Sequence, residues 1–362
     1  MKHLYKALLP AAAIALIPAY EAAAKDYYAG KRIEVFLPVP AGGGLDRNAR
    51  TFMNTFGKHV PGNPTIVMKN MPGGGGQRAI NHVFAKGGNK GLRLIWGPMN
   101  FGGIVAGLPG IRYKPEEFKP LGAFTTPFVT IVRTDIVAGG MKSPADIMKA
   151  KNFVNGGRIP GGSLGTYGIL SYNMLGLKYR HSIGYRNQPK LKAAIIQSEI
   201  QSLSTGNPGF WIFYANDLLK KGVATTLFYH PPYNAQTGKL LDVEPGFYGK
   251  GVDSFPVFYK KVTGKEPSGA TYEVYKWWST YAIWAMWTNA GPKTPEAQMK
   301  ILRAAYAANA KDPDFLKRYK KGNKRAPSVL SGKDAGIVAK GYRKLSKAGV
   351  AELKRVLNVG RK

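Results

Sequence analysis

Two glycine-rich loops constrain the fold of this chain most strongly, because each stands where a strand pattern changes into an amphipathic helix pattern. The loops cover residues 40–46 and 70–76. Glycine leaves the backbone N–H groups of such a loop uncovered, and the positive end of the helix dipole adds to their attraction for a negative group. We therefore interpret the loops as two halves of one anion-binding cleft. Tight turns without a ligand are the alternative.

The segments around these loops follow a repeating order of strand and helix. Alternating apolar residues predict strands at 32–37, 65–68 and 92–96, and apolar residues at helical spacing predict a helix after each loop. This βαβαβ order is typical of a parallel sheet with both loops at its carboxyl edge. The predicted fold class is therefore α/β.

The first 24 residues have the features of a secretory signal peptide. Lys2 and Lys6 precede an apolar stretch at 7–17, and a run of alanines ends at Ala24. This order predicts cleavage after Ala24 and export. No later stretch reaches the roughly 20 apolar residues that a spanning helix needs, so we expect a soluble product.

Cysteine is absent and positive charge is in large excess. The 362 residues include 53 Lys+Arg and 20 Asp+Glu, a formal net charge of +33, and no Cys, which excludes disulfides, thiolate metal sites and cysteine nucleophiles. A field of this sign attracts anions and promotes adhesion to polyanions or anionic lipid head groups. A basic proteome or an acidic habitat is the explanation of the charge that we favour. The densest run, 317–325, is expected to be solvated surface.

The remaining pattern predicts a second α/β unit inserted into the first. Strand and helix signals alternate from 127 to 229, which we interpret as domain 2 with its own parallel sheet. Residues 25–126 and 230–362 would form domain 1, with an irregular return over 230–269. The aromatic run 277–287 is predicted to be a buried strand of the first sheet.

The sequence offers no catalytic constellation. The histidines His59, His82, His181 and His230 are scattered without a metal-binding spacing, and there is no G-x-S-x-G elbow and no dinucleotide or nucleotide-binding loop. The chain is therefore expected not to be an enzyme and to need no cofactor and no metal. An enzyme in the same cleft would require an acid/base pair that the sequence does not contain.

Some polar and aromatic residues near the loops are candidates for the cleft. Asp46 fits the N-cap of the first helix, worth about 1 kcal/mol, or a cleft-facing acceptor. Arg47 and Arg158 could pair with a distal ligand carboxylate, and surface exposure is the alternative. The residues after the third strand, at the same sheet edge, could floor the pocket: Trp96, Asn100 and Phe101. For Trp96 the alternative is the core. A pocket-lining aromatic residue among Trp96, Phe101 and Trp211 would favour an aromatic or long apolar carboxylate over citrate.

From Tyr28 to the C-terminus the chain resembles the periplasmic solute-binding receptors of tripartite tricarboxylate transporters, often called Bug proteins. Their P-G-G-x-x-D loop corresponds to GGGLD at 42–46, and their N-x-P-G-x-G-G loop to NMPGGGG at 70–76. Their domain-crossing segment looks like FVTIVRTD at 128–135, and their Y-G-S-x-G-x-G-S loop is similar to NGGRIPGGS at 155–163. Their V-P-Y-K-G landmark is altered to IGYRN at 183–187.

The resemblance implies a two-domain clam-shell of the Venus-flytrap kind, in which loop backbone holds one ligand carboxylate. It places the following residues in the ligand site: Gly43, Gly44, Asp46, Gly74, Gly75, Ser163 and Tyr185. Three departures concern the distal end of the ligand: Asn187 in place of a glycine, the additional Arg158 and Pro160, and the segment 204–207. They make Arg158, Thr205 and Asn207 candidate pocket residues.

The sequence as a whole therefore predicts a periplasmic, monomeric receptor for a small organic carboxylate. The resemblance implies that it delivers the ligand to membrane permease subunits, and no specific nucleic acid partner is expected. Hinges are predicted near Thr126 and Tyr229. The alternative is an exported, strongly basic protein that binds anionic polymers or outer-membrane lipid by charge, a mode of binding that salt would weaken.

Overall fold

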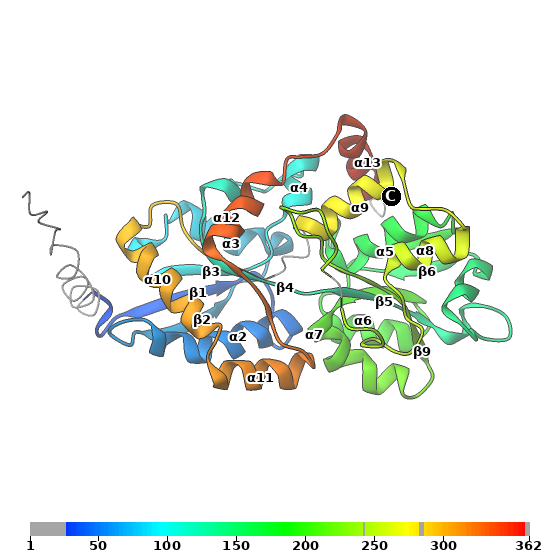
Figure 1. Cartoon of the computed structure of the whole chain (residues 1–362), viewed down its shortest axis with the longest axis horizontal. Helices are drawn as coiled ribbons and strands as arrows, with labels where there is room; N and C mark the ends of the chain where they lie inside the picture. The colour runs from blue at the N-terminus through cyan, green and yellow to red at the C-terminus, as the bar shows by residue number, and fades with distance from the viewer. Residues whose placement is uncertain (1–26, 242, 282–285, 359–362) are drawn as a thin grey trace, which may run out of the picture.

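The computed structural model describes residues 27–241, 243–281 and 286–358. Figure 1 shows two α/β units lying side by side, joined where strand β4 runs on into strand β5. The predicted signal peptide and its cleavage site lie outside the described residues. The α/β, two-unit fold class predicted from the sequence is confirmed.

The first unit is built on a six-stranded mixed sheet with the order β11-β4-β10-β3-β1-β2. Strand β1 pairs in parallel with β2 and β3, as the βαβαβ pattern predicts, and β10 lies antiparallel between β3 and β4. The strands are β1 (Arg32–Leu37), β2 (Thr65–Asn70), β3 (Arg93–Gly97), β4 (Lys119–Thr125), β10 (Met286–Ala290) and β11 (Ser328–Ser331).

The second unit has a five-stranded sheet with the order β7-β6-β8-β5-β9. Strand β6 is parallel to β7 and β8, whereas β5 is antiparallel to both of its neighbours. The prediction of a parallel second sheet is therefore wrong for β5, because this strand continues almost directly from β4 and enters the sheet from the first unit. The strands are β5 (Phe128–Arg133), β6 (Phe153–Gly156), β7 (Tyr179–Ser182), β8 (Ser202–Gly206) and β9 (Ala224–His230).

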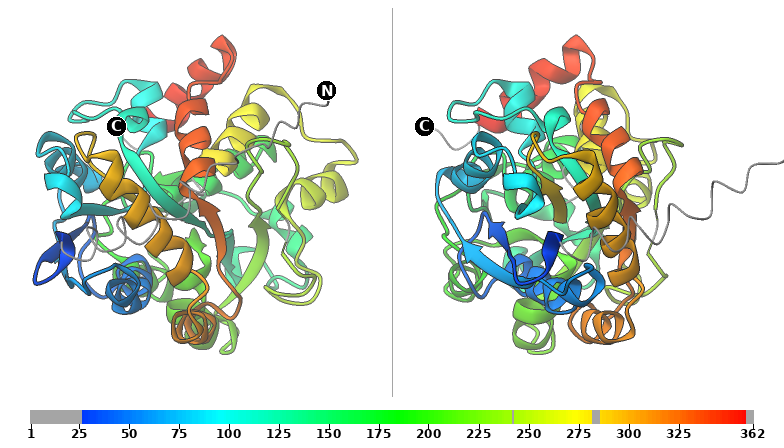
Figure 2. Two further views of the ribbon diagram at one scale, coloured as in Figure 1. Left: turned by 60° about the vertical axis from the view of Figure 1, so that its left-hand side comes forward. Right: turned by 90° about the vertical axis from the view of Figure 1, so that its left-hand side faces the viewer.

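Helices cover both faces of the sheets (Figures 1 and 2). In β1, Val35 and Leu37 face the helices α2, α10 and α11, whereas Phe36 faces α3, so the strand is buried on both sides. The helices are α2 (Gly44–Phe56), α3 (Gln77–Ala85), α4 (Phe101–Ala106), α5 (Ser163–Met174), α6 (Gln188–Ile196), α7 (Asn207–Gly209) with its π-helical continuation η8 (Phe210–Leu219), α8 (Phe255–Thr263), α9 (Gly269–Tyr281), α10 (Glu296–Asn309), α11 (Pro313–Asn323), α12 (Gly332–Gly341) and α13 (Lys347–Asn358). Short 3₁₀ turns connect several of these elements.

Phe52 of α2 is at the centre of an aromatic cluster in the first unit. Its ring centroid lies 4.8 to 5.1 Å from the rings of four buried partners: Trp96, Phe124, Tyr306 and Phe315. Edge-to-face and tilted arrangements at this spacing are the favourable ones for aromatic rings. Trp96 is only 1 % exposed in this cluster, so it belongs to the core and not to the cavity described below.

The aromatic run 277–287, predicted to be one strand, is divided between two elements. Trp277 and Trp278 lie on helix α9, and Met286 and Trp287 lie in strand β10, whereas residues 282–285 of the run are outside the described residues. The indole N–H of Trp277 donates to the backbone carbonyl of Tyr342 at 2.8 Å. The prediction is wrong because aromatic residues favour strands only through the neighbours they meet, and here a helix gives them buried neighbours.

The chain after β9 stays beside the second sheet before it reaches β10. Phe228 of β9 packs against Phe255 and Phe258 of α8, and His230 is hydrogen bonded to Tyr275 of α9. Helix α13 packs on α5 and α9 and also on α4 of the first unit. The division of the chain into 25–126 plus 230–362 and 127–229 stays a prediction.

Candidate functional site

A cavity of about 210 Å³ lies between the two units, where the loops that follow β1 and β2 meet the second sheet. Most of its residues belong to loops and to the first turns of helices. The first unit contributes Pro38, Val39, Pro40, Ala41, Gly43, Gly44, Leu45, Gly75, Pro98 and Met286, and the crossing segment and second unit contribute Thr126, Phe128, Arg158, Ile159, Gly162, Ser163, Leu164, Arg186, Asn187, Gln188, Gly206, Pro208 and Gly209.

The first glycine loop presents the start of α2 to this cavity. Gly43 is the N-cap residue, with φ −75° and ψ 168°, and the helix begins at Gly44. The N–H groups in the first turn of a helix have no acceptor within the helix. Gly43, Gly44 and Leu45 line the cavity, so this end of the helix dipole can attract an anion held there.

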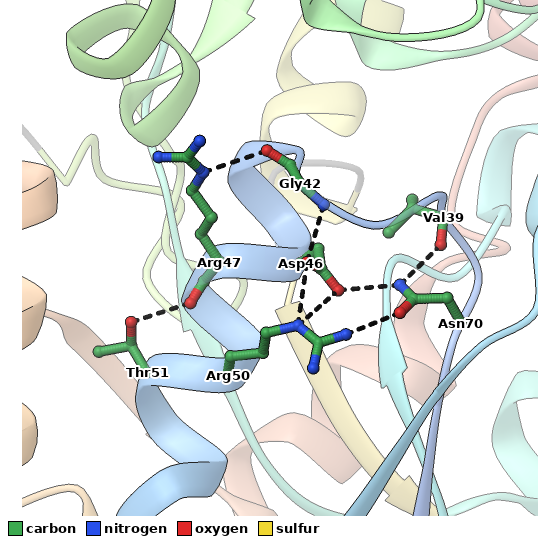
Figure 3. Close-up of polar contacts among 7 residues, drawn as sticks. All are labelled: Val39, Gly42, Asp46, Arg47, Arg50, Thr51 and Asn70. Carbon is green, nitrogen blue, oxygen red and sulfur yellow. Dashed lines mark hydrogen bonds and ion pairs between the residues drawn. The ribbon is translucent and has the colours of Figure 1, made fainter.

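Asp46 supports this loop from behind (Figure 3). Its Oδ2 accepts the N–H of Gly42 at 2.9 Å, and its Oδ1 accepts the Nδ2 of Asn70 at 2.8 Å. Arg50 donates to Asp46 and, at 2.7 Å, to Asn70. The carboxylate therefore joins the first glycine loop to the start of the second. The expected N-cap role is wrong, because Gly43 is the N-cap and Asp46 is the third residue of the helix.

The environment of Asp46 stabilises its charged form. The side chain is 2 % exposed, and burial by itself raises the pKa of a carboxyl group. Hydrogen bonds from Arg50, Asn70 and the N–H of Gly42 outweigh burial and lower the pKa of Asp46 below its ordinary value. The residue is consequently a charged anchor of the loops, and it is not among the residues that line the cavity.

The second glycine loop depends on glycine at four successive positions. The residues from Gly73 to Gly76 all have positive φ, with angles of 135°, 54°, 67° and 99° in chain order. Side chains strain such a backbone, whereas glycine adopts it freely. Gly75 lines the cavity, but Gly74 does not.

The two units touch at both glycine loops. A Cβ placed on Gly44 would lie 3.3 Å from the backbone nitrogen of Gly209 and 3.4 Å from the Cβ of Pro208. A Cβ on Gly75 would lie 3.0 Å from the Cδ1 of Ile159. The cavity is thus bounded by both units, which contact each other at both glycine loops.

Three helix starts of the second unit also border the cavity. Gly162 is the N-cap of α5, Asn187 of α6, and Gly206 of α7. Ser163, which the resemblance places in the ligand site, is the first residue of α5, and it lines the cavity. Together with α2, four helices begin at this cavity, an arrangement that favours a negative ligand group.

The charged residues of the lining are both arginines. Arg158 and Arg186 are the charged residues among the described residues that border the cavity, and no Asp or Glu is in that set. Burial lowers the pKa of Arg158 from its ordinary value. The lining therefore contributes positive charge and backbone donors.

Five of the predicted site residues meet in this cavity, and eight do not. Gly43, Gly44, Gly75, Ser163 and Arg158 line it. The eight outside the lining are Asp46, Gly74, Tyr185, Trp96, Asn100, Phe101, Thr205 and Asn207. Ligand contact by any of the thirteen stays a prediction.

Several of the residues outside the lining have structural partners. The hydroxyl of Tyr185 donates to Glu199 at 2.6 Å. Asn100 caps α4 by accepting the N–H of Gly103, and Phe101 is 1 % exposed and packs in the core. The Oγ1 of Thr205 accepts the side-chain amide of Gln188 at 3.0 Å, directly behind the cavity wall.

Four residues that line the cavity were not predicted from the sequence: Arg186, Gln188, Pro208 and Gly209. A local signal was available, because an Asn followed by a Pro two positions later marks the start of α6, and the Gly206 to Gly209 segment has the composition of a turn. That these starts lie next to the first glycine loop depends on contacts between distant parts of the chain, which spacing does not reveal.

The histidines of the described part of the chain have structural surroundings. His230 lies between Thr130 and Tyr275 at 2.8 and 3.1 Å, and His59 is paired with Asp312 at 2.8 Å. Burial lowers the pKa of His181 to about 4. Within the described ranges no group of three His, Cys, Asp or Glu residues is placed to bind a metal ion.

Comparison with known proteins identifies the architecture as that of periplasmic binding proteins. The structure of the periplasmic binding protein BugD superposes with a TM-score of 0.65 at 17 % identity, covering 92 % of this chain and 99 % of BugD. MatC from Rhodopseudomonas palustris with bound malate has a TM-score of 0.61 at 18 % identity over 91 % of this chain and 99 % of its own. A further R. palustris protein, with adipate, has a TM-score of 0.63 at 16 % identity over 91 % and 98 % of the two chains.

Sequence comparison points in the same direction. The "UPF0065 protein in the TAR-I ttuE-ttuC' intergenic region" of Agrobacterium vitis is 31 % identical over 119 residues, which span 33 % of this chain and about a third, 34 %, of that relative. No family model matches the chain. The resemblance to Bug-type proteins found in the sequence is confirmed at the level of the fold, since the similar structures include the periplasmic binding protein BugD and a TctC solute binding protein from Polaromonas. Both are described as binding proteins and not as enzymes.

Proposed function

We propose that this protein is a periplasmic receptor that captures a small organic carboxylate in the cavity between its two units. It releases the ligand to the membrane permease of a tripartite tricarboxylate-type transporter, and it works as a monomer without a cofactor. Affinity comes from backbone N–H groups and helix dipoles in a cavity that closure of the two units removes from water. Within the described residues, none of the helices is both long and apolar enough to cross a bilayer.

The convergence of four helix starts on one cavity carries this proposal. The helices α2, α5, α6 and α7 all begin there, and the described lining residues include two arginines and no acid. A neutral ligand would leave many of the N–H groups at the helix starts without an acceptor, whereas a carboxylate accepts hydrogen bonds from several N–H groups at once. The cavity volume of about 210 Å³ is smaller than that of typical drug-sized pockets, so the ligand is small.

The structural neighbours support the same class of ligand. MatC was solved with malate and another R. palustris protein with adipate, both small dicarboxylates. At 16 to 18 % identity these proteins share the fold with this chain. The carboxylate class is therefore our proposal for this chain, argued from its own cavity.

The rival function, adhesion to anionic polymers or lipid by charge, has one observation in its favour. Helix α11 presents a run of exposed cations: Lys317, Arg318, Lys320 and Lys321. A solvated basic face was expected here, and it needs no cavity. Binding through such a face weakens steeply with salt, whereas binding in a closed cavity does not.

A thermal-shift screen of the chain from Lys25 onward tests the proposal. In about 200 mM salt, where exposed charges are largely screened, the protein is heated with mono-, di-, tri- and aromatic carboxylates. A ligand present at 100 times its Kd adds about 2.7 kcal/mol to the free energy of unfolding, which raises Tm by several degrees. A selective rise supports the receptor. No rise with any carboxylate, together with salt-sensitive binding to heparin or anionic vesicles, supports adhesion instead.

A further inference from the structure

We propose that Arg158 forms a cationic subsite that binds a second anionic group of the ligand, so that the cavity selects dicarboxylates over monocarboxylates of the same length. This inference rests on the proposed receptor function. It adds a particular side chain that determines specificity, beyond the backbone donors of the glycine loops.

Arg158 is partly buried and has no ion-pair partner among the described residues. Its Nε is buried without a hydrogen-bond partner, and no carboxylate among the described residues lies within ion-pair distance of its guanidinium. Arg133, another partly buried arginine of the same unit, is paired with Asp135 at 2.6 Å. Arg158 is partly buried and its enclosed Nε has no partner in the chain, so an anion that enters the cavity can supply one.

Backbone contacts hold the loop segment that carries Arg158. The carbonyl of Arg158 accepts the N–H of Gly184 at 3.0 Å, and the N–H of the preceding Gly157 donates to Ser182 at 2.8 Å. On the other side, a Cβ on Gly161 would lie 3.1 Å from Leu357 of α13. These contacts fix both ends of the segment that carries the guanidinium. A preorganised binding group loses little entropy when the ligand arrives.

The loop that carries Arg158 lies opposite the glycine loops, where the first carboxylate would bind. Ile159, the next residue, meets Gly75 of the second glycine loop, so Arg158 belongs to the face of the second unit that closes on the glycine loops. One carboxylate can rest on the N-terminus of α2 while another reaches the guanidinium. Arginine binds carboxylates through two parallel N–H···O bonds and stays charged at all physiological pH values.

Selectivity follows from what a monocarboxylate would leave unsatisfied. If the distal end of the ligand is a methyl group, the partly buried Arg158 faces an apolar group inside the cavity. The penalty for this uncompensated charge acts against the monocarboxylate, and the described lining has no Asp or Glu to relieve it. Arg186 also lines the cavity, but it is exposed, so solvent screens its charge.

The test is calorimetric titration with ligand pairs of equal chain length: succinate against butyrate, and adipate against hexanoate. The unmodified protein should prefer the dicarboxylate of at least one pair by about 10- to 100-fold, the range that corresponds to charge-assisted hydrogen bonds. Arg158→Gln and Arg158→Met should remove that preference. Arg158→Lys, which keeps the charge but loses the planar pair of donors, should retain part of it.

Control variants separate Arg158 from general charge. Arg180→Gln removes an exposed arginine of the same unit outside the cavity, and the dicarboxylate preference should persist. Arg186→Gln should reduce the preference by less than Arg158→Gln does. Thermal unfolding of each variant checks folding, and the pair Arg158→Gln and Arg158→Met gives two independent chances of a folded protein.

The outcomes distinguish the two proposals. If the unmodified protein binds none of these acids nor any other carboxylate of the thermal-shift panel, the receptor function itself fails. If it binds them but Arg158→Gln and Arg158→Met keep the dicarboxylate preference, the receptor stands and the Arg158 subsite is refuted. A preference lost in Arg186→Gln instead would also overturn the assignment to Arg158.

Discussion

Asn207 of α7 donates a hydrogen bond from its Nδ2 to the backbone carbonyl of Asn323 in α11, at 2.8 Å. The two residues are 116 positions apart and belong to different units. Asn323 is in turn paired with Asn48 of α2 through reciprocal amide bonds of 3.1 and 3.3 Å. All three side chains are at most 5 % exposed. This chain of asparagines therefore links the helix behind the first glycine loop to the second unit.

Asn207→Ala should weaken ligand binding and lower Tm. The change leaves the backbone carbonyl of Asn323 without its donor. It also leaves the indole N–H of Trp211 and the hydroxyl of Tyr248 without their acceptor. Each buried group left unpaired costs about 1–3 kcal/mol. Titration calorimetry measures the affinity, and small-angle X-ray scattering measures how compact the ligand-bound protein is.

The matched control for this link is Asn81→Ala. Asn81 also donates its side-chain amide to a backbone carbonyl at 2.8 Å, but the bond to Gly110 is exposed and lies within the first unit. Affinity should hardly change. Equal losses in both variants would show that the bond between Asn207 and Asn323 has no special part in closure.

Gly44→Val should abolish tight binding and leave the fold intact. The backbone of Gly44 is ordinary helix, so a side chain causes no strain there, but its Cβ would press on Gly209 and Pro208. Gly322→Val is the comparison, since Gly322 is also a helical glycine without positive φ, lies outside the cavity lining, and its Cβ would meet nothing within 4 Å. We expect Gly322→Val to retain most of the affinity in calorimetry. Identical behaviour of the two variants would mean that contact between the units at Gly44 is unimportant.

Asp46→Asn should destabilise the protein by about 1–3 kcal/mol, the cost of weakening a buried charge-assisted network. Because the folded protein lowers the pKa of Asp46, its carboxylate stabilises the fold above the ordinary carboxyl pKa of 3.8 and loses this effect as the pH falls through the lower, folded value. The gap in free energy of unfolding between the unmodified protein and the variant should therefore be full at neutral pH and narrow below 3.8. Urea unfolding at several pH values measures it.

The comparison variant for this carboxylate is Asp314→Asn, which removes an acid that is 67 % exposed. A surface substitution of this kind changes stability by no more than about 0.5 kcal/mol. If the difference in free energy of unfolding between the unmodified protein and Asp46→Asn stayed constant from neutral to acidic pH, the charge of Asp46 would not stabilise the fold.

Phe52→Ala should lower the free energy of unfolding by about 3–5 kcal/mol, as large-to-small changes at buried aromatic positions do. The variant removes ring contacts with Trp96, Phe124, Tyr306 and Phe315 at once. Val257→Ala, at a side chain that is 50 % exposed, should cost no more than about 0.5 kcal/mol. Urea unfolding checks both, and near-equal values would rule out Phe52 as the centre of the core.

The sequence predicted the glycine loops and a helix after each of them because these depend on neighbouring residues alone. A run such as GGGG at 73–76 permits positive φ at every position, and the structure has positive φ at all four. Arg158 was found for a different reason, as a departure from the pattern of the resembling family within a loop already expected at the cleft. In both cases local sequence carries the relevant physics.

Features that depend on distant parts of the chain were beyond such reasoning. Trp96 belongs to a strand buried on both faces, so periodicity could not tell whether its side chain pointed to the cavity or to Phe52. Trp277, on helix α9, donates its indole N–H to the carbonyl of Tyr342, 65 residues later, and the local pattern does not reveal this contact. Likewise, Asn207 was expected in the pocket, whereas its partner Asn323 holds it beside the pocket.

The packing of α13 on both units makes the end of the chain a sensor of closure. Because the helix packs on α4 of one unit and on α5 and α9 of the other, we expect a movement of the two units relative to each other to change the packing of α13, which carries the exposed Lys354. The chain has no cysteine, so Lys354→Cys would accept a thiol-reactive dye at a single place. An environment-sensitive fluorophore there would turn the protein into an optical reporter of its own ligand.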